Sequence, residues 1–441
     1  MARTSARPLV VLLAGALLAV AGCSSGGSTG ASSTSAVPGA LDPNQKVTIT
    51  WWTGQTADAE TLLEGLAAEY SKAHPNVTIN VSTGASTTDD LLQKLSAGFA
   101  SNDYPDISYS YGSWATQLGS SGRTLDITSN VAQPDVKWSD FPKSAQLTAT
   151  VNGKVIGFPA VVDNLGLIYN KDLFDAAGLS YPTPDWTWDD FRTAAKALTD
   201  SSKQVFGTAY PVNGSEDTTW RFWPQLWQNG GSILSSDQKT ATFNSQAGVD
   251  ALTYWQQLAQ DDKSVYLDQT GTHYEPLFLN NAIGMLVEGP WLLYDLNKNH
   301  VNYGVTVLPG TNGDHQTISG PDLWVMFNHN DAQRSAAAYD FTNWLTSPAQ
   351  DLRWNVYYGN LPLRKSEGSM AAFKKYVQKY PGGDIFFANL ANAVQPRPTV
   401  AGYVDLSQAI GDAIDKALVG GDDPKQVLND AAQTADQALA P

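Results

Sequence analysis

The chain of 441 residues carries 43 acidic and 27 basic residues, a formal net charge of −16, and a single cysteine. An acidic balance of this size argues against binding to nucleic acid or to anionic lipid headgroups, and one cysteine excludes a disulfide within the chain. A body of about 400 residues exceeds what one hydrophobic core usually supports, so we expect two lobes.

Residues 1–22 are predicted to be a signal peptide. Basic residues precede an uncharged apolar run, Leu9 to Ala21, which is too short to span a bilayer. The small residues before Cys23 resemble a bacterial lipoprotein signal, which implies cleavage before Cys23 and a diacylglycerol anchor on its thiol. An ordinary secretory peptide with an incidental cysteine is the alternative. Residues 23–45, rich in Ser, Gly, Thr and Ala, are predicted to be a flexible tether.

Patterns of apolar residues predict the order β-α-β-α after the tether. The strands are expected at residues 47–51, 77–81 and 105–109, and the helices at 62–70 and 91–99. This order implies a parallel sheet with helices outside it, in which ligands bind beyond the carboxyl ends of the strands. Gln55, Tyr111 and Trp114 fall at those ends, whereas Trp52 is equally well explained by the opposite face of the first strand.

The segment 151–171 is the most informative in the chain. Asn152-Gly153 between two β-like runs predicts a tight hairpin, and a second β-like run follows at Leu165 to Tyr169. Asp163-Asn164 interrupts this apolar passage. If the segment crosses between two lobes, Asp163 is a buried carboxylate that needs hydrogen-bond donors. A turn between two strands with a solvated Asp-Asn pair is the alternative.

Large aromatic residues are unusually abundant, with 14 Trp, 18 Tyr and 14 Phe, and they are costly to place without burial or a ligand to stack on. Trp220, Trp223 and Trp227 lie on one face of a predicted helix, which suits core packing, and we expect at least one of them to contact a ligand. Further helices are expected at residues 187–198, 245–258, 331–345, 406–418 and from 423 onward.

Three separated motifs carry a resemblance to a known family. The pattern Asn-Gly-Lys-x4-Pro-x3-Asp-x5-Tyr-Asn-Lys at residues 152–171 resembles the extracellular sugar-binding proteins of ABC importers, which include the maltose-binding proteins. Residues 281–310, with Gly-Pro-Trp ending at Trp291, and residues 357–362 are similar to the same family. Residues 320–324 occupy the place of its second interdomain crossing, where Asp322 and Trp324 depart from the usual small residues.

The resemblance covers about residues 46–440 and implies an α/β, two-lobed periplasmic-binding-protein-like fold of type II. Each lobe would be a mostly parallel sheet flanked by helices, with three crossings between lobes. The implied N-terminal lobe is 46–160 plus 320–357, and the C-terminal lobe is 161–319 plus 358–441.

The implied function is capture of a disaccharide or short oligosaccharide by hinge closure, and delivery to the transmembrane subunits of an ABC permease. The protein would be a lipid-anchored monomer at the extracellular face of the cytoplasmic membrane, and no cofactor or metal is expected. In this family the acid matching Asp163 binds sugar hydroxyls and the tryptophan matching Trp291 stacks on a pyranose.

Sugar binding needs flat aromatic faces and paired polar groups. The candidates of both kinds, drawn from both lobes, are Trp52, Gln55, Tyr111, Trp114, Asp163, Trp220, Glu288, Trp291, Trp324, Tyr358 and Arg364.

The sequence also bears on other classes of function. Outside the predicted tether no Gly-x-Ser-x-Gly motif appears, and the five histidines lack metal-ligand spacing, so we expect that the protein is not an enzyme. A secreted glycosidase using Asp163 and Glu288 is the rival among enzymes. A phosphate or phosphodiester ligand would need clustered basic residues, for which Arg364 and Arg397 are the candidates. An amino acid or peptide ligand would need a fixed Asp-Arg pair, which one sequence does not reveal.

Overall fold

The computed structural model describes residues 38–55, 57–85, 88, 90–214, 216–395 and 397–440. The predicted signal peptide, Cys23 and most of the predicted tether therefore lie outside the described residues. Within the described ranges, every helix is too short or too polar to cross a bilayer.

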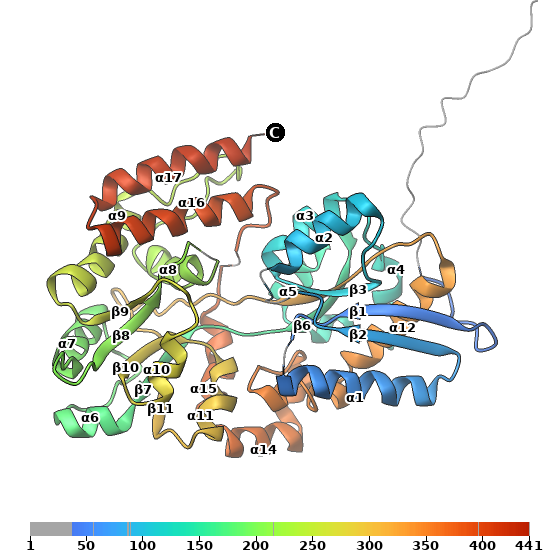
Figure 1. The fold of residues 1–441 in the computed structure, drawn as a ribbon, viewed down its shortest axis with the longest axis horizontal. Helices are drawn as coiled ribbons and strands as arrows, with labels where there is room; N and C mark the ends of the chain where they lie inside the picture. The colour runs from blue at the N-terminus through green and yellow to red at the C-terminus, as the bar shows by residue number, and fades with distance from the viewer. Residues whose placement is uncertain are drawn as a thin grey trace, which may run out of the picture. The chain divides into compact units, whose positions relative to one another are not determined.

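The N lobe is defined by a five-stranded sheet with the order β2-β1-β3-β12-β6. Its strands are β1 (Val47–Trp52), β2 (Val77–Ser82), β3 (Ile107–Ser110), β6 (Gly157–Val161) and β12 (Asp322–Met326). Strand β1 pairs in parallel with β2 and β3, whereas β12 runs antiparallel to β3 and β6. The long flanking helices are α1 (Ala57–Ala73), α2 (Asp90–Ser101) and α12 (Ala332–Leu345) (Figure 1).

The C lobe is defined by a second five-stranded sheet with the order β11-β7-β10-β8-β9. Its strands are β7 (Gly166–Asn170), β8 (Phe206–Pro211), β9 (Val265–Asp268), β10 (Ile283–Glu288) and β11 (Tyr303–Thr306). Strand β8 is parallel to β9 and β10, and β7 is antiparallel to β10 and β11. The long flanking helices are α7 (Trp188–Leu198), α8 (Glu216–Gln228), α9 (Gln246–Gln256), α16 (Tyr403–Asp415) and α17 (Pro424–Leu439).

Shorter helices and strands connect the two sheets and their long helices. They are α3 (Ala115–Ser120), α4 (Thr128–Val131), α5 (Lys143–Thr148), β4 (Thr150–Val151), β5 (Lys154–Val155), α6 (Lys171–Ala177), α10 (Tyr274–Leu279), α11 (Leu293–Lys298), α13 (Pro348–Asp351), α14 (Ala371–Lys379) and α15 (Gly383–Asn389). The predicted hairpin at Asn152-Gly153 joins β4 to β5, and both of its central residues have positive φ. Helix α7 begins with the predicted capping box, formed by Thr187 and Asp190.

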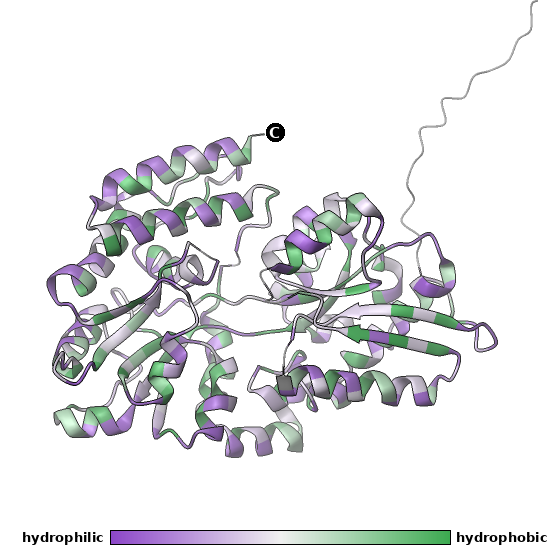
Figure 2. Ribbon diagram, viewed as in Figure 1, coloured by the Kyte–Doolittle hydropathy of each residue, from purple (hydrophilic) through white to green (hydrophobic). Residues whose placement is uncertain are grey.

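Each lobe has its own buried apolar side chains. Trp51, Phe158 and Phe341 belong to the N-lobe core, whereas Phe222 and Trp255 belong to the C-lobe core. Helices α1, α16 and α17 alternate hydrophilic and hydrophobic residues along their length, as expected where one face of a helix packs on the core (Figure 2). This packing accounts for two separate sheets within one chain.

The sheets are mixed rather than mostly parallel, because each contains two parallel and two antiparallel pairings. The reason lies in the crossings. Strand β6 leaves the N lobe toward the C lobe, and β12 returns from the C lobe, so β12 runs in the opposite direction to β6 and β3. The Leu361 N–H also donates to the carbonyl of Val162 at 3.2 Å, which places the segment after α13 beside the first crossing.

Candidate functional site

The first two crossings meet at Gly320. The Gly320 N–H donates to Asp163 Oδ1 at 3.2 Å, and the Asp163 side chain is buried, with the residue 6% exposed. A Cβ atom at position 320 would lie 2.8 Å from Trp220 Cζ2 and 3.0 Å from Arg397 Nη2. Glycine therefore allows an acid from the first crossing, an indole from α8 and a guanidinium to approach the second crossing closely.

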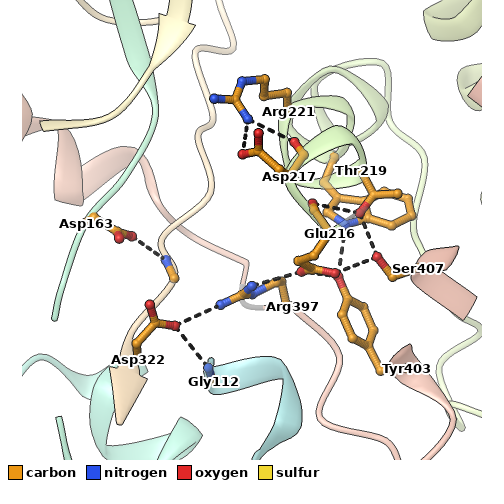
Figure 3. Close-up of polar contacts among 12 residues, drawn as sticks. Gly112, Asp163, Glu216, Asp217, Thr219, Arg221, Asp322, Arg397, Tyr403 and Ser407 are labelled. Carbon is orange, nitrogen blue, oxygen red and sulfur yellow. Dashed lines mark hydrogen bonds and ion pairs between the residues drawn. The ribbon is translucent and has the colours of Figure 1, made fainter. Parts of the chain in front are cut away.

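A chain of charged side chains continues from this point (Figure 3). Asp322 Oδ1 accepts a hydrogen bond from the Gly112 N–H at 3.0 Å and lies 3.7 Å from Arg397 Nη2. Asp322 Oδ2 accepts from the Tyr109 hydroxyl at 2.6 Å. Arg397 Nη1 lies 2.9 Å from Glu216 Oε1 at the start of α8. Because Asp322 belongs to the N-lobe sheet and Glu216 to a C-lobe helix, Arg397 links the two lobes electrostatically.

Burial dominates the acid–base properties of this region. Burial raises the pKa of the Asp163 carboxyl well above its ordinary value, and the neighbouring Asp322 raises it further. Burial also raises the pKa of Asp322 to about 6, although Arg397 opposes the shift. A protonated Asp163 can both donate and accept a hydrogen bond, which suits a ligand hydroxyl group.

Two tryptophans form an aromatic surface beside these acids. The rings of Trp220 and Trp291 are stacked, with centroids 5.6 Å apart and an interplanar angle of 25°. Trp220 is 8% exposed, and its buried Nε1 finds no acceptor among the residues that the structure describes. All three tryptophans of α8 belong to the C-lobe core cluster, in which Trp223 and Trp227 are 0% and 3% exposed. Trp220 is the most exposed of the three, and it also lies beside Gly320 at the second crossing.

Glu288 is held by other protein groups. It is fully buried at the end of β10, its Oε2 lies 2.6 Å from Arg221 Nη2, and its Oε1 accepts from the Gly289 N–H at 3.0 Å. Arg221 also donates to the Val287 carbonyl and pairs with Asp217. This buried pair fixes the turn that presents Trp291, so Glu288 supports the aromatic surface.

The remaining candidates lie at the rims of the two lobes. Trp52 ends β1, and Lys94 Nζ lies 4.3 Å from its ring centroid. The nearby ends of β2 and α2 border a hollow of about 670 Å³, which Lys94 also lines. Gln55 is half-buried, and the Tyr111 and Trp114 rings contact each other at 4.7 Å. Trp52 is thus the last residue of β1, and Gln55, Tyr111 and Trp114 follow the carboxyl ends of β1 and β3, with Trp114 buried in the N-lobe core.

Tyr358 belongs to a tyrosine cluster near the third crossing. Its ring contacts Tyr294 at 4.9 Å and Tyr357 at 5.1 Å. The Tyr294 hydroxyl donates to Asp58 Oδ2 at 3.3 Å, which joins α11 of the C lobe to α1 of the N lobe. Tyr358 therefore lies where the rims of the two lobes approach each other.

Two predictions are corrected by the structure. Trp324 is 0% exposed and packs in the N-lobe core against Trp51 at 5.1 Å and Trp354 at 5.6 Å. Arg364 is 4% exposed and donates to the carbonyls of Val136 at 2.8 Å and Thr346 at 3.1 Å. Both side chains are occupied by packing within the N lobe, so we exclude them from the proposed site.

The sequence did not single out several residues of the crossing region. Glu216 accepts from the Tyr403 hydroxyl at 3.1 Å and from Ser407, and Ser407 lies 2.7 Å from Thr219 Oγ1. An acid at the start of a helix is common because it complements the helix dipole. The sequence therefore does not mark Glu216 as a residue of the functional site. The sequence suggests Arg397 only as a residue for anionic ligands, and it marks Asp322 only as a departure from the family pattern.

The buried carboxyl of Glu367, in the same region as Arg364, is expected to make the stability of the protein depend on pH. Burial raises the pKa of Glu367 far above its ordinary value of 4.5, and the charge of Asp351 adds to the shift. Folded protein therefore keeps a proton that unfolded chains release above about pH 4.5, and stability falls as pH rises. We expect Glu367→Gln to raise the free energy of unfolding, with a gain that grows by up to about 1.4 kcal/mol per pH unit.

Urea denaturation at about pH 5 and about pH 8 would measure this effect. Glu64→Gln, on the exposed face of α1, is the matched control and should leave the pH slope unchanged. An equal effect of Glu367→Gln at both pH values would contradict a buried proton on Glu367.

In the described part of the chain, no cluster of three or more His, Cys, Asp or Glu residues could hold a metal ion.

Comparisons with known proteins agree on one family. The family model described as bacterial extracellular solute-binding protein matches residues 65–434. An sn-glycerol-3-phosphate-binding periplasmic protein of Rhizobium meliloti is 24% identical over 421 residues, covering 89% of this chain and 94% of that protein.

Two solved structures are similar along most of the chain. An ABC substrate-binding protein from Listeria monocytogenes in complex with cycloalternan is 28% identical, with a TM-score of 0.81 over 90% of this chain and 99% of that chain. The cyclic α-maltosyl-1,6-maltose binding protein from Arthrobacter globiformis is also 28% identical, with a TM-score of 0.75 over 89% and 99% of the two chains. These likenesses confirm the predicted two-lobed fold.

Proposed function

The chain belongs to the bacterial extracellular solute-binding proteins, and we propose that it is the substrate-binding component of a carbohydrate ABC importer. It captures a disaccharide or short oligosaccharide between its lobes and delivers it to the transmembrane subunits of the permease. The observation that carries the proposal is the stacked pair Trp220 and Trp291 beside the Asp163 carboxyl. Aromatic faces pack on the C–H face of a pyranose, and the carboxyl pairs with its hydroxyls.

The ligand-contacting residues follow from this arrangement. From the N lobe and first crossing we propose Trp52, Gln55, Tyr111, Trp114 and Asp163. From the C lobe and third crossing we propose Trp220, Trp291 and Tyr358, with Glu288 as their support. A ligand that touches both sets favours the closed arrangement by its differential affinity, which is the basis of hinge closure. We propose lobe boundaries of 46–160 plus 320–357 and 161–319 plus 358–441. The places of β6 and β12 in one sheet support the first two boundaries, whereas Arg364 donates to N-lobe carbonyls beyond the last one.

The proposed location and partners follow from the family and the N-terminus. The family is extracellular, and we propose that Cys23 carries the lipid anchor that holds the protein, as a monomer, at the outer face of the cytoplasmic membrane. We propose no catalytic role, because Glu288 pairs with Arg221 and thus is no free partner for Asp163 in a glycosidase mechanism.

A phosphorylated polyol is the second candidate ligand, because the Rhizobium relative is named for sn-glycerol 3-phosphate. The charges near the crossings weigh against it. Arg397 and Arg221 both pair with acids at 2.9 Å or less, and Asp163 and Asp322 add further acidic groups. A phosphate would have to compete with these acids for each guanidinium.

A thermal-shift screen of the chain without its predicted signal peptide tests the proposal. Cycloalternan and cyclic α-maltosyl-1,6-maltose come first in the panel, because two similar structures are of proteins that bind them. Maltose, trehalose, cellobiose, xylobiose and sn-glycerol 3-phosphate follow. A saccharide at a hundred times its dissociation constant should stabilise the native state by about 2.7 kcal/mol and raise the melting temperature. A shift with sn-glycerol 3-phosphate and with none of the saccharides would contradict the proposal.

A further inference from the structure

Arg397 is a basic side chain placed at the crossings, yet its charge is already balanced. Arg397 is 9% exposed, and its guanidinium lies 5.6 Å from the ring centroid of Trp220, within the proposed site. A free guanidinium in that position would be a suitable two-pronged donor for a phosphate or carboxylate. Here Nη1 lies 2.9 Å from Glu216 and Nη2 lies 3.7 Å from Asp322. Both ends of the donor fork therefore face protein carboxylates.

Glu216 is held in position for this pairing. The Tyr403 hydroxyl donates to its Oε1 at 3.1 Å, and the Ser407 hydroxyl donates to its Oε2 (Figure 3). Glu216 is also the first residue of α8, a helix of 13 residues whose N-terminus favours a negative charge. These contacts order the carboxylate before any ligand arrives.

Glu216 and Asp322 already outnumber the charge of Arg397, even when Asp163 is counted as protonated. Asp163 and Asp322 flank it from the first two crossings, and the nearby Arg221 is fully used by Glu288 and Asp217. An entering anion would lose its water, face these acids, and have to displace Glu216 from a preformed ion pair. A neutral saccharide meets no such barrier.

We propose that Glu216 is a specificity-determining residue, which neutralises Arg397 and so excludes phosphorylated ligands from a site that takes neutral saccharides. The inference rests on the proposed function, because it concerns the same site. Glu216 acts through Arg397, so it is a positioning residue, and removal of its charge should change which ligands bind more than how stably the protein folds.

Isothermal titration of Glu216→Gln with sn-glycerol 3-phosphate and glucose 6-phosphate tests the inference. We expect no detectable binding to the wild type, and an association constant of the variant at least about tenfold above the smallest value that the titration detects. The gain should shrink when salt rises from about 0.05 to about 0.5 M, because it depends on the freed charge. Glu64→Gln makes the same change in net charge on the exposed face of α1 and should gain nothing.

Two further variants keep the test decisive. Asp322→Asn leaves the Glu216 contacts intact and frees the other end of Arg397, so it should give a smaller gain, and this variant decides the matter if Glu216→Gln does not fold. Adding Arg397→Gln to Glu216→Gln should abolish the gain.

The outcomes separate this inference from the proposed function. Absence of a gain in both Glu216→Gln and Asp322→Asn, or a gain that survives Arg397→Gln, would overturn the role of Glu216 while wild-type saccharide binding stands. Tight wild-type binding of sn-glycerol 3-phosphate would overturn the exclusion itself. Only a wild type that binds no saccharide would also remove the proposed function.

Discussion

Replacing Trp291 by alanine is expected to weaken saccharide binding by more than about tenfold. The ring is half-buried and stacked on Trp220 at 5.6 Å, so alanine removes one of the two aromatic faces offered to a sugar. A tenfold loss corresponds to about 1.4 kcal/mol, which a single stacked aromatic can supply through buried area and ring contact together. Titration calorimetry with whichever saccharide gives the largest thermal shift would measure the loss.

The control for this result is Trp223→Ala on the same helix as Trp220. Trp223 is fully buried in the C-lobe core, so its removal should lower the stability of the ligand-free protein by about 3–5 kcal/mol. Trp291→Ala should lower it much less. If the two variants destabilise the empty protein equally, Trp291 is a core residue and the proposed aromatic surface is misplaced.

Replacing Arg221 by alanine is expected to have the largest effect on stability. Its guanidinium is buried and lies 2.6 Å from Glu288, and it also donates to the Val287 carbonyl and to the Tyr274 hydroxyl. Removing one partner of a buried ion pair leaves the other charge unpaired, at a cost of about 3–5 kcal/mol. Differential scanning calorimetry of the ligand-free protein would show a lower melting temperature.

The pH dependence of this loss of stability distinguishes an unpaired Glu288 charge from lost packing. Burial already raises the pKa of Glu288, and Arg221 opposes that shift, so the pKa should rise further without Arg221. The folded variant then retains a proton that the unfolded chain releases, and its loss of stability should grow as pH rises above 4.5. A loss that stays constant with pH would point to lost packing. Arg353→Ala, which breaks an exposed pair with Glu69, should leave stability nearly unchanged.

Local sequence patterns were sufficient to predict the structural features that depend on residues close together in the sequence. The hairpin at Asn152-Gly153 and the capping box of α7 depend on side chains within three residues of each other. The motif around Asp163 marked the first crossing correctly between β6 and β7. These features required no knowledge of the rest of the chain.

Positions set by distant residues could not be predicted in this way. Arg364 finds its acceptor at Val136, 228 residues away, and Arg397 pairs with Glu216 across 181 residues. The register between β12 and β6 also shifts between Asp322 and Leu323, where Ala160 is the extra residue on β6. Asp322 and Trp324 both contact Tyr109, but Asp322 begins β12 beside the crossing whereas Trp324 lies further along the strand in the core.

The unpaired indole N–H of Trp220 has a thermodynamic consequence for the empty protein. A buried donor without an acceptor costs about 1–3 kcal/mol, and here that cost is present before any ligand binds. A ligand oxygen that reached Nε1 would relieve this penalty, so part of the binding free energy would originate in a disadvantage of the unliganded state. The empty protein is, in this sense, less stable than it would be with the indole paired.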